Sequence, residues 1–255
     1  MTKHKCTTLQ KPAQSASEKI FTMNLIKEFE RRLDTSINPN FTDRKSRNDF
    51  VARSLLADEA SILNIGGGGK RHLKEALDDE KQVFEIDMEG DCDLRINLDK
   101  IDRLEFQDES FDLCCAFDVL EHLEQFHLIY AEMLRIARQG VLVSLPVSSS
   151  EIPLVLQNRK RKIPNLETGI YSKFYGLPLQ HPTDRHRWWL YFDDIVTFFL
   201  NEEAEKPIKV SFYIRQSISW KGKLIRLISK RIYYNFVTPY IFIRITKNAP
   251  LTSKD

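Results

Sequence analysis

The stretch Ile62-Leu-Asn-Ile-Gly-Gly-Gly-Gly-Lys70 is an apolar strand that runs directly into four consecutive glycines. A helix-compatible stretch, residues 72–77, begins just after it. Glycine permits the backbone angles of a tight strand-to-helix turn, and its missing side chain lets a ligand lie against the main chain near a helix N-terminus. The pattern therefore predicts a strand, a ligand-binding turn and a helix, although glycine clusters also occur in plain loops.

An acidic strand end supports the ligand-binding interpretation. The next apolar strand, residues 83–86, ends at Asp87, 19 positions after Gly68. This offset is close to the roughly 20 residues that separate a glycine turn from a ribose-binding carboxylate in nucleotide folds. Taken by itself, Asp87 could equally well be an ordinary solvent-exposed residue at the end of a strand. Together with the glycines, a carboxylate that accepts from both ribose hydroxyls is the better interpretation.

Two familiar nucleotide-binding patterns are missing from the chain. The dinucleotide fingerprint G-x-G-x-x-G would need glycine at position 71 or 72, where Arg71 and His72 stand. The phosphate loop G-x-x-x-x-G-K-[ST] is also absent. A dehydrogenase is therefore disfavoured, and a P-loop nucleotide hydrolase is excluded.

Composition indicates an ordinary globular protein. The 255 residues are 42% hydrophobic and 29% charged, and a net charge of +2 gives no global reason to expect a nucleic-acid partner. The four cysteines form no C-x-x-C pair and lie near no histidine at zinc-ligand spacing, so we expect reduced thiols and no metal. No apolar leader and no apolar run of about 18 residues is present, which predicts a cytoplasmic protein.

The order of apolar runs predicts a doubly wound α/β fold with a mostly parallel sheet. A helix is expected over residues 125–138, ended by Gly140. The expected strands are residues 62–65, 83–86, 92–96, 111–117, 141–145, 208–214 and 240–246.

Three regions are predicted along the chain. Residues 1–14 form a disordered tail, and residues 15–60 form a helical cap with helices from Ser15 and over 43–60. Residues 61–255 form the main domain, with an irregular insertion at 147–206 on the acceptor side.

Four motifs in this order resemble the class I S-adenosylmethionine-dependent methyltransferases, in particular the type 11-like branch that modifies small molecules and glycans. Asn64 and the glycines look like the cofactor loop, and Asp87 like the acidic end of the second strand. Residues 104–112, Leu-Glu-Phe-Gln-Asp-Glu-Ser-Phe-Asp, look like the family's lead into strand four. Asp118-Val-Leu-Glu-His122 then matches its "x-V-L-E-H" motif. The strong resemblance covers residues 61–146.

This resemblance implies a Rossmann-like methyltransferase that uses S-adenosylmethionine. By the same resemblance, Asn97 bonds the adenine amine and Leu98 lines the ring, while the segment from Phe117 lies beside the cofactor. The cofactor-binding residues that it implies are Asn64, Ile65, Gly66, Gly67, Gly68, Asp87, Met88, Asn97, Leu98, Phe117 and Asp118.

Two departures from the family pattern bear on activity. The family usually has an acid where Asn64 stands and a third spaced glycine where Lys70 stands. An amide can still order the loop through hydrogen bonds, but it supplies no carboxylate. The alternative is therefore a catalytically inactive scaffold or sensor that binds the cofactor without transferring its methyl group.

Two histidines are candidate catalytic residues. Transfer to an oxygen needs a base, and His122 has suitable chemistry if it does not merely order the following helix. By resemblance, His186 lies over the active site, with a loop anchor as its alternative. Trp188 and Trp189 are candidate substrate platforms or simple core residues.

Two basic stretches of the sequence have two interpretations, as ordinary solvent-exposed faces or as binding surfaces. The first is Arg159 to Lys162. In the second, cations alternate with apolar residues over positions 221–232, a pattern that also fits peripheral contact with an anionic membrane or a phosphorylated, lipid-linked acceptor. We therefore expect methyl transfer to a small-molecule, glycan or lipid-linked acceptor, at oxygen. The sequence leaves the acceptor, the pathway and the oligomeric state open.

Overall fold

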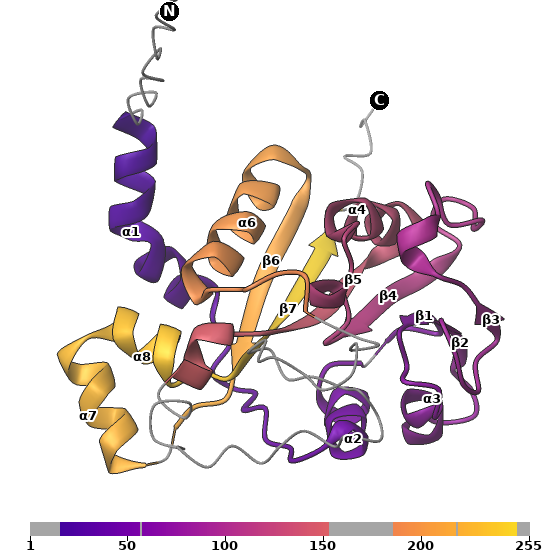
Figure 1. Cartoon of the computed structure of the whole chain (residues 1–255), viewed down its shortest axis with the longest axis horizontal. Helices are drawn as coiled ribbons and strands as arrows, with labels where there is room; N and C mark the ends of the chain where they lie inside the picture. Colours follow the sequence, from indigo (N-terminus) through magenta and orange to yellow (C-terminus); the bar gives the residue numbers. More distant parts are fainter. Residues whose placement is uncertain (1–15, 57, 153–185, 218, 249–255) are drawn as a thin grey trace, which may run out of the picture.

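The computed structural model describes residues 16–56, 58–152, 186–217 and 219–248, and in them the chain forms one seven-stranded sheet between two layers of helices (Figure 1). The strand order is β3-β2-β1-β4-β5-β7-β6. Strands β1 to β5 pair in parallel, and β7 is antiparallel to both of its neighbours. The strands are β1 Ser61–Ile65, β2 Gln82–Asp87, β3 Leu94–Arg95, β4 Phe111–Phe117, β5 Ala137–Pro146, β6 Ile208–Ile214 and β7 Tyr240–Lys247. The predicted α/β fold with a mostly parallel sheet is confirmed.

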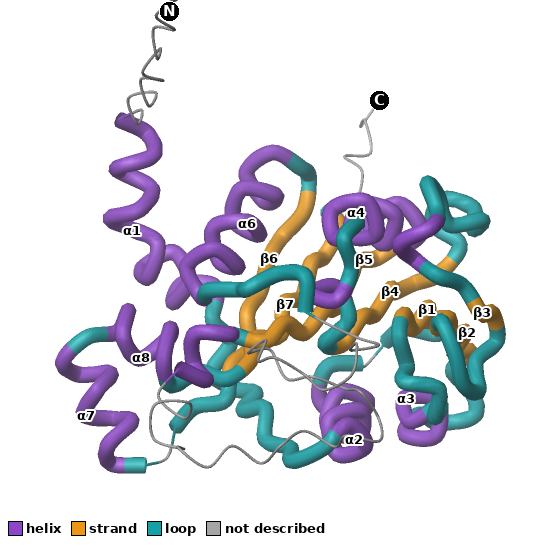
Figure 2. Tube along the Cα trace, viewed as in Figure 1, coloured by secondary structure: helices purple, strands orange, loops and turns teal. Residues whose placement is uncertain are grey.

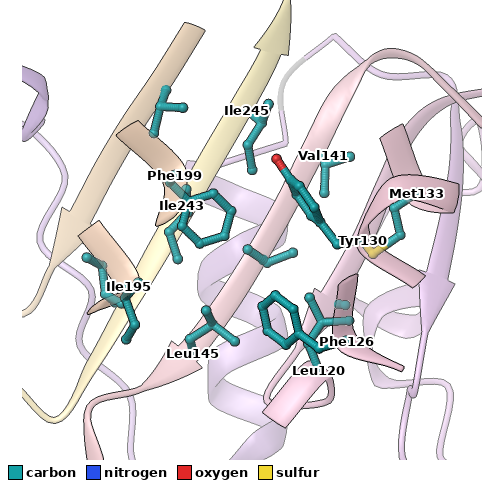
Figure 3. Packing of buried hydrophobic residues seen from close by; sticks show 14 of the residues in the cluster. Leu120, Phe126, Tyr130, Met133, Val141, Leu145, Ile195, Phe199, Ile243 and Ile245 are labelled. Atoms are coloured by element: carbon teal, nitrogen blue, oxygen red, sulfur yellow. The ribbon is translucent and has the colours of Figure 1, made fainter. Parts of the chain in front are cut away.

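Alternate residues of β1, β4, β5 and β7 enter two separate cores, as the period of two in a strand requires. On one face, Phe29 of α1 (Ala16–Arg32) packs against Phe192 of α6 (Phe192–Glu205), in a core that α4 (Phe126–Ile136) also covers. Figure 3 shows Tyr130 and Phe199 meeting over the strands on this face. On the other face, α2 (Arg44–Ser54) and α3 (His72–Ala76) cover a smaller core around Phe242. The tube view shows the same two helical layers (Figure 2).

The two helices expected as an N-terminal cap over 15–60 thus lie on opposite faces of the sheet. The second is also shorter than the expected 43–60. Asp43 caps it by accepting from the Ser46 amide at 2.8 Å, and it ends at Ser54. Residues beyond Ser54 leave the helix because the chain must turn into β1, and the buried Glu59 there forms an ion pair with Arg244.

The predicted helix 125–138 was too long at its C-terminus. It ends at Ile136, and β5 begins at Ala137. Gly140 is not a helix stop but lies inside β5, where an added Cβ would stand 1.9 Å from the carbonyl oxygen of Ile245 on β7. Close approach of two strands therefore requires this glycine.

The expected irregular stretch 147–206 was wrong at its end. Helix α6 forms there because Phe192, Val196 and Phe199 recur at helical spacing and are buried against the sheet. The third strand is two residues rather than the expected 92–96. The tail 1–14, His181 and the run Arg159–Lys162 lie outside the described residues.

The carboxyl ends of the parallel strands define one edge of the sheet, where ligands bind in open α/β folds. Short 3₁₀ turns follow there: η1 (Leu98–Lys100), η2 (Leu120–His122) and η3 (Ser148–Glu151). Helices α7 (Trp220–Ile228) and α8 (Lys230–Phe236) join β6 to β7 at this same edge. Among the described helices, none has the length and apolar character needed to cross a membrane.

Candidate functional site

The glycine turn after β1 has the left-handed backbone angles that only glycine adopts easily, as expected for the tight turn that the sequence predicts. Gly66, Gly68 and Gly69 have φ of 71°, 73° and 63°, values that residues with a Cβ rarely adopt. A Cβ on Gly66 would stand 2.4 Å from Cγ2 of Val119, just before η2. The turn therefore brings its bare backbone against the segment that follows β4.

Asp87, at the end of β2, binds this turn directly. Its Oδ2 accepts from the Gly68 amide at 2.8 Å and its Oδ1 from the Met88 amide at 2.7 Å. A carboxylate has about four acceptor positions, so acceptor capacity remains for a ligand hydroxyl. Met88 itself is 60% exposed beside it.

A buried carboxylate lies beneath the turn, next to the amide that replaces the family's acid. Asn64 Nδ2 donates to Glu85 Oε1 at 3.0 Å, and both side chains are buried. Burial raises the pKa of Glu85, while the hydrogen bond from Asn64 opposes that rise. Sequence reasoning missed Glu85, although an acid in an otherwise apolar strand was a readable signal.

Two arginines of α2 also reach the site, and sequence reasoning missed them too. Arg47 Nη1 lies 2.5 Å from Asp118 Oδ2, and the guanidinium lies 5.6 Å from the centre of the Phe117 ring. Asp118 also accepts from Ser144 Oγ at 2.8 Å. The Arg44 guanidinium is 2.9 Å from the place of a Cβ on Gly68. Their spacing of one helical turn was the available signal.

Asn97 and Leu98 lie after β3, as expected for residues at this edge. Asn97 caps η1, since its Oδ1 accepts from the Asp99 amide at 3.0 Å. The second lone pair of that oxygen is open to another donor. Leu98 is buried in the core, which leaves little of its side chain at the surface.

The two candidate catalytic histidines lie together. Their ring centroids are 4.4 Å apart, and the rings meet edge to face. The buried carboxylate of Glu121 has an oxygen 4.0 Å from His122 Nε2. The amide of Arg187 donates to the Glu121 carbonyl at 2.7 Å, which holds the chain next to His186 against η2.

The histidine pair also belongs to a group that could hold a cation. Glu121, His122 and His186 each offer a ligand atom, and these atoms lie within 4.8 Å of one another. Motif spacing did not predict this group because the fold, not the order of residues along the chain, brings His186 to η2.

Trp188 packs against the core and donates from Nε1 to the Leu123 carbonyl at 2.7 Å, so its contacts are those of a structural residue.

Comparison with known proteins matches the central part of the chain to one family model. Residues 63–145, from β1 to the end of β5, match the family model described as a methyltransferase domain. Over these residues the chain carries a methyltransferase domain. The cofactor of this methyltransferase is S-adenosylmethionine, as the resemblance of its motifs implies. No curated protein matches the sequence.

Solved structures of similar fold are distant in sequence. An S-adenosylmethionine-dependent methyltransferase from Archaeoglobus fulgidus is 15% identical, with a TM-score of 0.48, over 90% of this chain and 99% of that one. One from Mesorhizobium loti is 12% identical, with a TM-score of 0.44, over 80% and 100%. The [4+2]-cyclase SpnF is 13% identical, with a TM-score of 0.47, over 92% and 98%.

The side chains near the glycine turn of the methyltransferase carry charges that suit this cofactor. S-adenosylmethionine carries ribose hydroxyls, an ammonium and a carboxylate, and it supplies an electrophilic methyl group on a sulfonium. Asp87 provides an anionic acceptor and Arg44 a cationic donor on the same edge, while Asp118 and Arg47 pair with each other there. The glycines leave the backbone between them free of side chains.

Proposed function

We propose that the methyltransferase moves the methyl group to an oxygen of a small-molecule, glycan or lipid-linked acceptor. The observation that carries this proposal is the contact between His122 and His186 at the carboxyl edge of the sheet. An alcohol is a poor nucleophile until its proton is removed, and imidazole is the side chain best suited to accept that proton near neutral pH. Two imidazoles at the edge that carries the cofactor loop therefore favour oxygen as the acceptor atom.

Within this proposal, one imidazole takes the acceptor proton and its surroundings stabilise the charge that forms. The Glu121 carboxylate, 4.0 Å from His122 Nε2, is placed to offset a positive imidazolium. His186 is the candidate for direct contact with the acceptor, because its ring contacts His122 and the next residue, Arg187, is hydrogen-bonded to Glu121 of η2. The remaining acceleration of methyl transfer would come from alignment of the acceptor with the methyl group and from exclusion of water.

On the cofactor side, Asp87 would hold the ribose and Asn97 the adenine amine. Glu85 would supply the buried carboxylate that the family usually carries on β1. The chain would then keep an acid at this place although Asn64 is not one, because Glu85 lies on the neighbouring strand β2. The register supports this, since Asn64 and Glu85 are direct neighbours on β1 and β2. These roles favour an active enzyme over an inactive cofactor-binding sensor.

The test has two stages. Calorimetric titration of the full chain with S-adenosylmethionine and with its demethylated product measures cofactor binding. A methyl-transfer screen then compares phenols, glycans, lipid-linked glycans and RNA. Transfer to an oxygen in the first three classes supports the proposal. Transfer only to nitrogen or to RNA, or binding with no transfer at all, would overturn it.

A further inference from the structure

Helix α7 carries its apolar residues on the side that faces solvent. Trp220, Leu224, Leu227 and Ile228 follow the i, i+4, i+7, i+8 spacing of one helical face. Their exposed fractions are 70%, 46%, 84% and 74%. A surface helix normally turns such a face toward the core, so this arrangement is the reverse of the usual one.

Packing on the opposite side fixes this orientation. Gly222 is buried, and a Cβ there would stand 2.2 Å from Ser217 Oγ, so the helix lies close against the chain at that point. Ile225 packs against the main core. The apolar stripe therefore cannot turn inward without losing these contacts. Helix α8 carries a further exposed apolar side chain, Ile232, which is 51% exposed.

The surroundings of this stripe are basic. The segment 219–236 contains five lysines and arginines and no acidic residue. Lys230 and Arg231 form ion pairs with Glu30 and Asp193, which anchor α8 to the body of the protein. Lys221 and Lys223 are exposed and form no salt bridge within the described residues, so their charges are available on the stripe's flank.

We infer that α7 and α8 form a docking surface for an anionic lipid bilayer. An amphipathic helix with exposed Trp and Leu on one face and lysines beside it binds in the plane of a membrane interface. Each nearby cation adds attraction to anionic headgroups, and lysine stems can lie along the apolar layer while their ammonium groups stay in water. A protein partner fits less well, because lysine is depleted from protein interfaces.

The docking surface lies on the edge of the sheet that carries the site. Strand β6 ends and β7 begins at the edge where β5 ends, so the segment between them stands beside the carboxyl ends of the parallel strands. Ser149 Oγ of η3 donates to the Asn235 carbonyl of α8 at 2.7 Å. Figure 1 shows α7 at the outside of the molecule, in yellow. If the proposed function holds, a bound bilayer would present lipid-linked acceptors to this edge.

Co-sedimentation of the full chain with vesicles tests the docking surface. Phosphatidylcholine vesicles are compared with vesicles that also contain phosphatidylglycerol. We expect binding to the anionic vesicles, weakened by salt, and a blue shift of tryptophan fluorescence that Trp220→Phe removes. The double variant Lys221→Gln/Lys223→Gln should bind about tenfold more weakly or worse, and Leu227→Ser/Ile228→Ser about a hundredfold.

The matched control is Leu94→Ser/Lys209→Gln, which removes one exposed apolar and one exposed basic side chain elsewhere and should bind as the unaltered chain does. Equal binding by all variants, or none by the unaltered chain, would overturn the inference. So would a dimer in sedimentation equilibrium that Leu227→Ser/Ile228→Ser dissociates, since a second copy would then cover the stripe. Cofactor titration is independent of these outcomes, so failure here leaves the proposed function intact.

Discussion

Asn64 and Glu85 lie opposite each other on β1 and β2, and the amide of Asn64 donates to the Glu85 carboxylate at 3.0 Å. Both side chains are buried directly beneath the glycine turn. A Cβ on Gly67 would stand 3.4 Å from the same Glu85 oxygen, so the carboxylate lies in contact with the turn itself. This pair gives the site an acid that the β1 motif by itself lacks.

Glu85→Gln should increase stability at neutral pH while weakening cofactor binding. Burial raises the folded-state pKa of Glu85 above its unfolded value, so the folded protein binds that proton more tightly. The resulting stability is complete below the unfolded pKa, near 4.5, and is lost as pH rises toward the folded pKa. Glutamine keeps an acceptor for Asn64 and removes the titration.

The measurement is the unfolding free energy of both proteins from mildly acidic to neutral pH, beside calorimetry with S-adenosylmethionine. The stability difference should grow in favour of Glu85→Gln as pH rises. Parallel pH curves would show that Glu85 does not titrate as described, and unchanged affinity would show that its carboxylate does not serve the cofactor.

Asp87→Ala should weaken S-adenosylmethionine binding by about 1.5–3 kcal/mol, since a charged hydrogen-bonding group is lost. Part of that loss comes from the turn, because Asp87 also accepts from the Gly68 amide. Asp87→Asn keeps one acceptor for the turn and separates the two effects. Titration calorimetry gives both affinities, and an unchanged value for a folded Asp87→Ala protein would contradict the ribose assignment.

Gly68→Val should abolish cofactor binding and leave the fold largely intact. Gly68 has φ of 73°, which a β-branched residue strongly disfavours, and its Cβ would meet the Arg44 guanidinium at 2.9 Å. Arg44 is flexible and can move, so the damage should stay local to the turn. Circular dichroism checks the fold, and normal binding by this variant would show that the turn does not hold the cofactor.

His186→Ala should lower methyl transfer while cofactor affinity changes little. As the general base it would account for about 10²–10⁴-fold in rate, and the loss would shrink at high pH, where the acceptor ionises unaided. His127→Ala is the matched control, because this exposed histidine contacts Trp188, 5.6 Å between ring centroids, outside the pair. Equal damage to binding and turnover would instead give His186 a structural role.

Dialysis against EDTA should leave methyl transfer unchanged if the imidazoles handle a proton. The same three residues, Glu121, His122 and His186, offer ligand atoms within 4.8 Å of one another, so the outcome is informative. Activity that falls on dialysis and returns with added Mn²⁺ or Zn²⁺ would assign the group to a cation and remove both histidines as bases.

The amino-acid sequence by itself determined the elements whose signals are local. Strands 111–117 and 208–214 were predicted with the bounds that the structure has, and the glycine turn and Asp87 lie as their spacing indicated. Backbone freedom at glycine and strand periodicity depend on near neighbours along the chain, so pattern reasoning reaches them.

Only the tertiary structure decided which distant residues meet. The end of α4 at Ile136 depends on β5 pairing with β4 and β7, and the contact of His122 with His186 depends on how the later segment crosses η2. The packing of Gly222 on Ser217 turns the apolar stripe of α7 toward solvent. No helical pattern in the sequence reveals this, because amphipathic spacing shows that a helix has an apolar face but not what that face contacts.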